Sequence, residues 1–314
     1  MNFLYCFDSN YNQQALTSIF SLLDNTSSKI NLYIIHNDPT TFKIQKIINH
    51  KNLDIFKIYK FKNDKKIDFP NLNNSHVSEA TYYRLFIDEY LPQNLDKIVY
   101  LDADVICNEN PINILNQKFE EITDLKYAIG VFTTPITKAK DPEIFNRLQI
   151  SSKYFNAGVM MIDLKMWNEK NISENLLLTL QKLDQKIVYW DQDVLNSYFD
   201  GNYYEIDKNL NFIISSKTAK NNLIEYINKN TIYFIHYAGS NKPWTIEGGI
   251  NLNSNFYHNY FEKINENKYH IINSSNRFAS IKFLLKSVIS LQIFEVKRPA
   301  RYFFEALKSL FVSP

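Results

Sequence analysis

The chain has 314 residues, of which 45% are hydrophobic and 22% charged, a composition typical of a globular protein with a large buried core. Its formal net charge of +2 argues against a protein that binds nucleic acid through overall charge. The only two cysteines, Cys6 and Cys107, lie in apolar stretches, which favours a reducing compartment over a disulfide-stabilised fold.

Strands and helices are predicted to alternate over the first hundred residues. Short apolar runs predict strands at 3–7, 32–36, 55–61 and 98–101. Apolar residues at helical spacing predict helices at 15–25, 42–48 and 75–90. This alternation indicates an α/β fold with a mostly parallel central sheet. The first run has no basic segment before it and no stretch reaches membrane-spanning length, so we expect a cytoplasmic protein without a signal peptide.

The rest of the chain is less regular and ends in a different pattern. We expect a strand at 155–162, helices at 172–183 and 191–198, and a late strand at 232–236. From Arg277 onward, two apolar stripes with intervening Lys and Arg predict two helices. We therefore divide the chain into a large α/β domain, 1–265, and a small C-terminal helical appendage, 266–314. We expect the appendage to pack on this domain or to bind one of its ligands, and as a second interpretation to contact the inner face of the membrane.

Two carboxylates directly follow the strand at 98–101. Asp102 and Asp104 project to the same side of an extended chain, at the end of a strand where open α/β sheets bind ligands. Such a pair repels unless a cation lies between its members, although two solvated loop acids would give the same pattern. His236, after the late strand, would add an imidazole nitrogen, a set that suits Mn²⁺ better than Mg²⁺.

The segment after His236 has features of a phosphate-binding loop. Lys242 supplies a point charge, and Gly239 allows the backbone to approach a ligand closely. A core histidine beside a solvated lysine is the alternative reading of this segment.

Five separated motifs occur in order along the chain: Asp8-x-Asn10-Tyr11, Asp102-Ala103-Asp104, Tyr154-Phe155-Asn156-Ala157-Gly158, Asp191-Gln192-Asp193 and the stretch from His236 to Trp244. Together they resemble glycosyltransferase family 8, the family of glycogenin and of bacterial lipopolysaccharide galactosyl- and glucosyltransferases. The resemblance covers about residues 1 to 265. It implies the GT-A nucleotide-diphospho-sugar transferase fold and transfer with retention of anomeric configuration.

The resemblance also implies a role for each motif residue. Asp102, Asp104 and His236 would bind Mn²⁺, and Gly239 and Lys242 would contact the donor diphosphate. The uridine would be held by Asp8, Asn10, Tyr11 and the backbone of Cys6, and the ribose by the main chain of Ala103, where many members have Thr. The donor sugar would be contacted by Arg84, Asn156, Ala157, Asp191 and Gln192. Taken alone, Arg84 reads as a surface ion-pairing residue, Asp191 as a helix N-cap, and His76 as structural.

The expected reaction moves a hexose from a UDP-sugar to a hydroxyl of a glycan acceptor. We expect galactose as the transferred sugar, with glucose as the alternative. Three acceptors are open: a lipid-linked glycan, a capsular or lipopolysaccharide intermediate, or a sugar already linked to a protein such as a surface adhesin. The appendage, 266–314, is expected to bind this acceptor or only to pack on the catalytic domain, 1–265. Gln192 and Asp191 are the expected catalytic residues. An amide is a poor nucleophile, so attack by the acceptor on the leaving-group face is favoured over a covalent intermediate on Asp191.

Other functions account for part of the pattern. A non-catalytic, sugar-binding glycosyltransferase-like subunit would be expected to lose Asp102 or Asp104, and both are present. A Mg²⁺-dependent phosphohydrolase also has Asp-x-Asp after a strand, but usually with Gly-Thr next, where Val105 and Ile106 stand here. A sugar-1-phosphate nucleotidyltransferase would need a Gly-rich basic loop near the N-terminus, and the sequence has no such loop there.

Overall fold

The computed structural model describes residues 1–70, 78–214, 222–240, 242–266, 268–272 and 277–311. The chain folds into two compact units, each made of three segments. The first contains Met1–Ala15, Thr26–Ala103 and Asn110–Asn211, and the second contains Leu16–Asn25, Asp104–Glu109 and Phe212–Pro314. The chain thus passes from one unit to the other inside the Asp102-Ala103-Asp104 motif.

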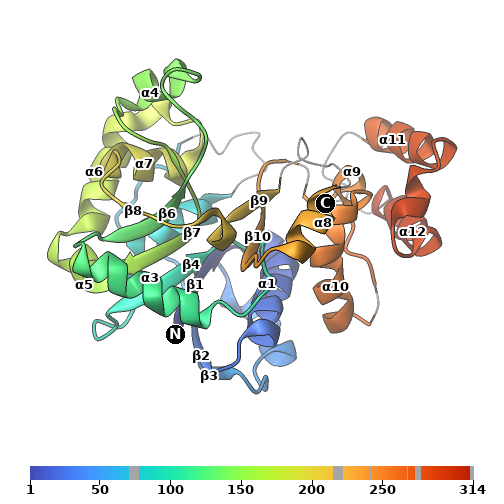
Figure 1. Ribbon diagram of the computed structural model, residues 1–314, viewed down its shortest axis with the longest axis horizontal. Coiled ribbons are helices and arrows are strands. Elements are labelled where there is room, and N and C mark those ends of the chain that lie inside the picture. Colours follow the sequence, from blue (N-terminus) through green and yellow to red (C-terminus); the bar gives the residue numbers. More distant parts are fainter. Residues whose placement is uncertain (71–77, 215–221, 241, 267, 273–276, 312–314) are drawn as a thin grey trace. The chain divides into compact units, whose positions relative to one another are not determined.

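The first unit is built on a seven-stranded sheet (Figure 1). Its strands are β1 (Asn2–Phe7), β2 (Ile30–His36), β3 (Leu53–Lys60), β4 (Lys97–Leu101), β6 (Ile129–Thr133), β7 (Phe155–Asp163) and β8 (Tyr204–Glu205), in the order β3-β2-β1-β4-β7-β6-β8. Strands β3, β2, β1 and β4 are parallel, and β7 runs antiparallel to both of its neighbours. The central strands are almost wholly buried, as their continuous apolar sequence requires.

Helices pack on this sheet and bring polar side chains to the end of β4. They are α2 (Ile87–Tyr90), α3 (Ile112–Asp124), α4 (Pro142–Leu148), α5 (Leu164–Glu169), α6 (Ile172–Leu183) and α7 (Trp190–Phe199), with the 3₁₀ helix η4 (Glu79–Phe86). Helix α7 packs against β7 and η4 packs against β1, so both approach the centre of the sheet.

The second unit has a small sheet and most of the C-terminal helices. Strand β10 (Phe234–Tyr237) lies between β5 (Val105–Cys107), to which it is antiparallel, and β9 (Phe212–Ile214), to which it is parallel. The helices are α8 (Asn222–Lys229), α9 (Ile246–Gly249), α10 (Asn255–Ile264), α11 (Arg277–Ile289) and α12 (Pro299–Ser309). Helix α1 (Asn12–Asn25) begins in the first unit and continues into the second.

The α/β fold with a mostly parallel sheet is confirmed, and two of the predicted helices differ. Residues 42–48 form only the single 3₁₀ turn η3 (Ile44–Lys46), because Phe42 is extended and no side chain caps the turn. The helix expected at 75–90 is a 3₁₀ helix that Ser78 caps, followed by α2, and its predicted first residues, with His76, lie outside the described residues. The division at residue 265 stays a prediction.

Candidate active site

Arg84 is the centre of a buried polar cluster in the first unit. Its Nη2 donates to Asp102 Oδ1 at 2.6 Å and its Nη1 to the carbonyl oxygen of Ala157 at 2.7 Å. The guanidinium lies over the ring of Tyr100, 3.9 Å from its centroid, and its Nε is 2.9 Å from Asp191 Oδ2. Burial lowers the pKa of Arg84, but the two carboxylates outweigh it and hold this pKa above its ordinary value. The reading of Arg84 as a surface ion-pairing residue is therefore wrong.

Asp191 contributes a buried carboxylate oxygen to the same cluster. Its Oδ1 accepts a close hydrogen bond from Thr81, but Oδ2 has no hydrogen-bond donor among the described residues. The nearby Nε of Arg84 makes an ion pair with Oδ2, while its hydrogen points to the Thr81 carbonyl, 3.3 Å away. Burial raises the pKa of Asp191 to about 6, with Arg84 opposing the rise. Helix α7 begins at Trp190, so the reading of Asp191 as its N-cap is also wrong.

Gln192 is held by the motif on β7. Its Oε1 accepts from Asn156 Nδ2 and from the backbone N–H of Ala157, each at 3.1 Å. Its Nε2 donates to the hydroxyl of Tyr154 at 3.0 Å. The structure thus brings together the β7 and α7 motifs, which are about 35 residues apart in the chain. The side chain of Gln192 is only partly buried, so it is open to a ligand.

The two motif aspartates are held by different partners. Asp102 directly follows β4, where its N–H donates to the carbonyl of Gly158 at 2.9 Å and its Oδ1 accepts from Tyr100 at 2.6 Å. Asp104 forms a close ion pair with Lys242, and its Oδ1 lies 3.3 Å from His236 Nε2. Burial raises the pKa of Asp104, but Lys242 and His236 outweigh it and hold this pKa well below its usual range.

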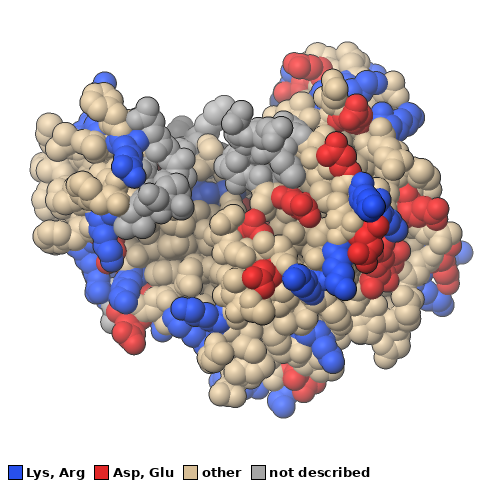
Figure 2. All heavy atoms as spheres, turned by 180° about the vertical axis from the view of Figure 1, so that it is seen from behind, with Lys and Arg blue, Asp and Glu red and all other residues tan. Residues whose placement is uncertain are grey.

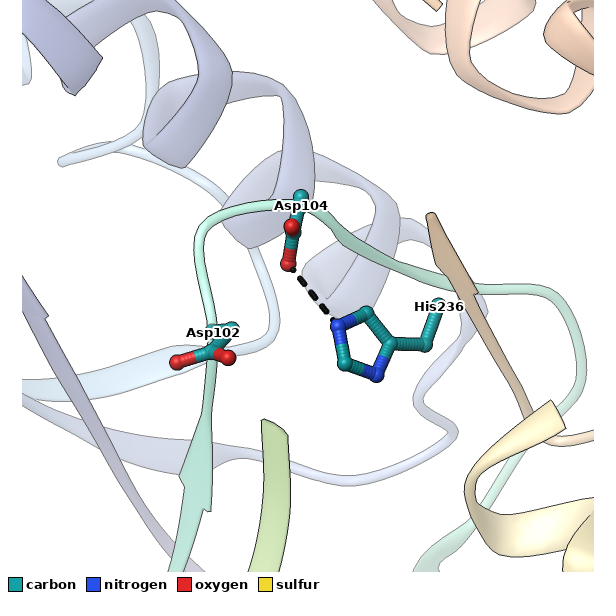
Figure 3. Close-up of side chains that lie close together, drawn as sticks. All are labelled: Asp102, Asp104 and His236. Carbon is teal, nitrogen blue, oxygen red and sulfur yellow. Dashed lines mark ion pairs between the residues drawn. The ribbon is translucent and has the colours of Figure 1, made fainter. Parts of the chain in front are cut away.

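Asp102, Asp104 and His236 fit a divalent cation. Each offers one ligand atom, and these atoms all lie within 4.8 Å of one another. Figure 3 shows the three side chains and the ion pair between Asp104 and His236. Asp104 Oδ1 is buried with no hydrogen bond from the described part of the chain, a costly state that a bound cation would relieve. Two carboxylates and an imidazole are a suitable ligand set for such an ion.

The remaining predicted residues of the first unit lie on β1, on the turn that follows it and at Ala103. At the end of β1, Asp8 caps the one-turn 3₁₀ helix η1 (Ser9–Tyr11), and its Oδ1 accepts from the backbone N–H of Asn10 at 2.9 Å. Cys6 is buried on β1, which raises the pKa of its thiol, and Ala103 is buried too.

In the second unit, Gly239 has φ +88°, which favours glycine. A Cβ added there would meet no heavy atom within 4 Å, so the backbone is open on that side. Lys242 Nζ also donates to the carbonyl of Tyr237 at 2.6 Å.

Some residues of the cluster were not predicted. Thr81, Tyr100 and Tyr154 all bond to predicted site residues. Tyr100 carries a usable signal, since a tyrosine two residues before Asp102 projects from the same side of the strand. Tyr154 is itself part of a motif but was given no role, and for Thr81 the sequence offers no signal apart from its place in the same helix as Arg84.

Comparison with known proteins agrees with this arrangement. The sheet and the buried polar cluster at the end of β4 define a GT-A glycosyltransferase fold. The profile of the family described as "Glycosyl transferase family 8" matches residues 2–248, so the chain belongs to that family and is a glycosyltransferase. The resemblance of the five motifs is thereby confirmed.

Individual relatives are similar over much of the chain. The lipopolysaccharide 1,2-glucosyltransferase of Escherichia coli is 30% identical over 247 residues, covering 76% of this chain and 71% of that protein. The lipopolysaccharide 1,3-galactosyltransferase of Salmonella typhimurium is 29% identical over 187 residues, 56% of this chain and 52% of that one. The crystal structure of the galactosyltransferase LgtC with donor and acceptor sugar analogues superposes with a TM-score of 0.69 at 20% identity, covering 84% of this chain and 96% of LgtC. The last similarity supports the fold alone.

None of the helices in the described residues has both the length and the apolarity needed to cross a membrane.

Proposed function

We propose that this chain transfers a hexose from a UDP-sugar to a hydroxyl of a glycan acceptor, with retention of anomeric configuration. The observation that carries the proposal is the buried cluster in which Arg84 joins Asp102 to Asp191. It links the aspartate motif to the residues expected to contact the donor sugar. The names of two relatives, a glucosyltransferase and a galactosyltransferase, support a hexose. Galactose is the proposed sugar, with glucose as the alternative.

The nucleotide is assigned to loop residues. Asp8, Asn10, Tyr11 and the backbone of Cys6 would hold the uridine, and the main chain of Ala103 the ribose. The open backbone at Gly239 and the ammonium of Lys242 would contact the diphosphate. Phosphate oxygens compete well for a lysine, so Lys242 would exchange its contact with Asp104 for one with the donor.

The metal is assigned to Asp102, Asp104 and His236, and its proposed identity is Mn²⁺ because the set mixes oxygen with imidazole. When bound, the cation would neutralise the negative charge that develops on the diphosphate as it leaves.

The chain's own residues constrain the chemical step. The buried, unbonded Oδ2 of Asp191 would accept a hydrogen bond from a hydroxyl of the donor sugar. Gln192 is a poor nucleophile, and its amide oxygen already accepts two hydrogen bonds. A covalent glycosyl ester on Asp191 would remove the negative charge that pairs with buried Arg84. We therefore favour attack on the leaving-group face: the bond from the anomeric carbon to the phosphate oxygen breaks, the bond to the acceptor oxygen forms, and the departing phosphate takes the acceptor's proton.

The acceptor is proposed to be a glycan made in the cytoplasm, either of the lipopolysaccharide type named for two relatives or linked to a surface adhesin. Incubation with a panel of UDP-hexoses and Mn²⁺ tests the function, with the released UDP and free sugar measured. Release of both from one UDP-hexose is expected. Release of inorganic phosphate from phosphate esters instead would favour the phosphohydrolase. UDP-sugar binding without turnover, with or without glycan acceptors, would favour the non-catalytic subunit.

A second proposal concerns the segment 266–314, whose helices have two different apolar faces. One face is buried: Tyr302, Ala306 and Leu310 share a hydrophobic cluster with Ile246 and Ile250 near α9. The other face is open. Of the seventeen large apolar side chains that are exposed in the described residues, ten lie between 278 and 311. An exposed apolar concentration of this size marks an interaction site.

Helix α11 shows most clearly that the exposed face is the more apolar one. Its buried positions are Ser280, Leu284 and Ser287, two of them polar. Its exposed positions include Phe278 and Ile289, which are 76% and 83% exposed. The helix therefore turns its more apolar face away from the protein.

We propose that this face lies on an anionic lipid surface at the inner side of the membrane. Residues 277–311 contain seven Lys or Arg against two Glu. In Figure 2 the part of the surface that carries α11 and α12, on the left, is mainly tan with several blue patches. Apolar side chains interspersed with basic ones match the interface of a bilayer that contains acidic lipids.

Co-sedimentation with phosphatidylcholine vesicles, with and without phosphatidylglycerol, tests the lipid contact. The protein should sediment with the acidic vesicles, less so at high salt, and Phe278→Ser with Ile289→Ser should abolish the effect. Leu178→Ser, which removes a 57% exposed apolar side chain from α6, is the matched control and should change nothing. Protein that stays in solution with acidic vesicles at low salt would rule out this contact, and concentration-dependent self-association would assign the face to a second copy.

A further inference from the structure

Asp193 is a buried acid next to the proposed catalytic pair, and no step assigned above uses it. Its side chain is completely inaccessible to solvent. Its Oδ2 accepts from Arg147 Nη1 at 2.5 Å and from the backbone N–H groups of Val188 and Tyr189, each at 2.8 Å. Its Oδ1 accepts from the hydroxyl of Tyr154 at 2.9 Å. A carboxylate so held is an acceptor only, and all four contacts are donors.

This arrangement determines the direction of the hydroxyl hydrogen of Tyr154. A tyrosine hydroxyl has one hydrogen, and Asp193 accepts it. The hydroxyl therefore offers only lone pairs to its other neighbour, the Nε2 of Gln192 at 3.0 Å. Burial and the charge of Asp193 raise the pKa of Tyr154 well above its usual value, so the hydroxyl keeps its hydrogen over the whole working range of pH.

The opposite end of the Gln192 amide is determined independently. The backbone N–H of Ala157 can only donate, so the atom of Gln192 that faces it at 3.1 Å must be the oxygen. The two constraints agree, and the reverse orientation of the amide would place N–H against N–H at one end and leave the tyrosine oxygen facing a carbonyl at the other. The amide thus has one allowed orientation, in which one Nε2 hydrogen goes to Tyr154 and a second remains.

We propose that Asp193 and Tyr154 are positioning residues that fix the orientation of the Gln192 carboxamide and leave its second N–H for the donor sugar. This inference rests on the proposed function, since it requires Gln192 to act on the donor. Asp193 also holds the backbone at the start of α7, where Trp190 has φ +46°, a left-handed conformation that is strained in a non-glycine residue. A strained turn held by a buried carboxylate is a feature of preorganised sites.

A double-mutant cycle on Tyr154 and Gln192 tests the inference, because it separates an effect that passes through Gln192 from general loss of stability. The variants are Tyr154→Phe, Gln192→Ala and the double substitution, each with kcat, donor KM and Tm measured for hydrolysis of the UDP-hexose. Tyr203→Phe is the matched control: Tyr203 belongs to the same buried core and its hydroxyl bonds to Thr133 at 3.1 Å.

Tyr154→Phe should lower kcat about tenfold or more with donor KM nearly unchanged, and it should have no further effect on kcat in the Gln192→Ala background. The control should lower Tm by a similar amount as Tyr154→Phe and leave kcat unaltered. Asp193→Asn gives a second measure: its amide would donate to Tyr154 and reverse the hydroxyl, so kcat should fall at least as far.

Two results would overturn the inference. One is a wild-type kcat in folded Tyr154→Phe. The other is that Tyr154→Phe reduces kcat by the same factor whether Gln192 is present or replaced by alanine. Should Tyr154→Phe not fold, wild-type kcat in Asp193→Asn would decide against it in the same way. Failure of the proposed function looks different. In that case Gln192→Ala itself would keep the wild-type kcat, or the wild-type protein would hydrolyse no UDP-hexose.

Discussion

Arg84 Nε and Asp191 Oδ2 lie 2.9 Å apart, yet the hydrogen on that nitrogen points to the Thr81 carbonyl. The pair is therefore an ion pair without a directed hydrogen bond, and Asp191 keeps one buried oxygen that has no hydrogen-bond donor among the described residues. Arg84 meanwhile donates its directed hydrogen bonds to Asp102 and to the Ala157 carbonyl. One guanidinium thus positions three separate chain segments, which a lysine has too few fixed donors to do.

Replacing Arg84 by lysine should therefore inactivate the enzyme although the charge is kept. We expect kcat to fall by about a hundredfold or more, and unfolding free energy to fall by about 2–4 kcal/mol, because buried carboxylates lose their partners. Steady-state kinetics and denaturant unfolding measure the two effects. Arg298→Lys is the control, since its side chain is 37% exposed and 3.7 Å from Glu262, and it should behave as wild type. Near-normal kcat in Arg84→Lys would exclude the positioning role.

Asp191 should give the activity a pH dependence near 6. Its folded pKa of about 6 lies above the ordinary unfolded value of about 3.9. The carboxylate that we propose accepts a sugar hydroxyl is lost as pH falls below 6, so kcat/KM should decline there. Asp191→Asn has an uncharged amide at all pH values, so its kcat/KM should be lower overall but should not decline further below pH 6. The same decline in the variant would show that another group causes it.

The sign for stability is opposite to that for activity. Because the folded pKa is raised, the folded state binds the proton more tightly than the unfolded state. The stability contribution of Asp191 is therefore fully present below about pH 4 and is lost as pH rises through 6, with a slope of at most about 1.4 kcal/mol per pH unit. Thermal unfolding of wild type and Asp191→Asn between pH 4 and 7 should show this difference in slope. Parallel curves would contradict the raised pKa.

Lys242 should affect the leaving group and not the acceptor. Lys242→Ala removes the ammonium expected to contact the diphosphate, so UDP affinity and turnover should both fall, by about tenfold or more, with every acceptor tested. Calorimetric titration with UDP and Mn²⁺ measures the first effect, and Lys263→Ala, an exposed ion-pairing lysine of the same unit, is the control. A change confined to the acceptor KM would show that the assignment is wrong.

Asp102→Asn should weaken the cation site while preserving the local structure. An asparagine carbonyl can still accept the hydrogen bonds from Arg84 and Tyr100, but the side chain no longer brings a negative charge to the metal. We expect weaker Mn²⁺ binding, measured from the free-ion signal by electron paramagnetic resonance, and loss of most activity with an unchanged circular dichroism spectrum. Asp38→Asn, outside the motif, is the control. Unaltered Mn²⁺ affinity in Asp102→Asn would remove this residue from the ligand set.

The parts of the fold that sequence could predict are those determined by local pattern. Buried parallel strands are continuous apolar runs, so β1, β2 and β4 were placed within a few residues, and Asp102 and Asp104 could be assigned to the end of β4. Segment 42–48 has helical spacing but packs Phe42 and Ile47 into the core without forming a helix, a tertiary effect that periodicity cannot show.

The missing parts of the site depend on contacts between distant segments. In the sequence, Arg84 cannot be distinguished from an arginine on a helix surface, because its contacts with the ends of β4 and β7 are formed only in the folded chain. Asp191 matches the pattern of an N-cap, but helix α7 begins one residue earlier, at Trp190. Tyr154 and Asp193 reveal their role only through the direction of one hydroxyl hydrogen.

The most direct measurement is the anomeric configuration of the transferred sugar. The purified enzyme would be incubated with UDP-galactose, or UDP-glucose as the alternative, together with Mn²⁺ and a glycan acceptor, and the product followed by proton NMR from the earliest time points. We predict an α-linked product from the α-linked donor, with formation stopped by chelator. A β-linked product, or no transfer from either donor, would contradict it.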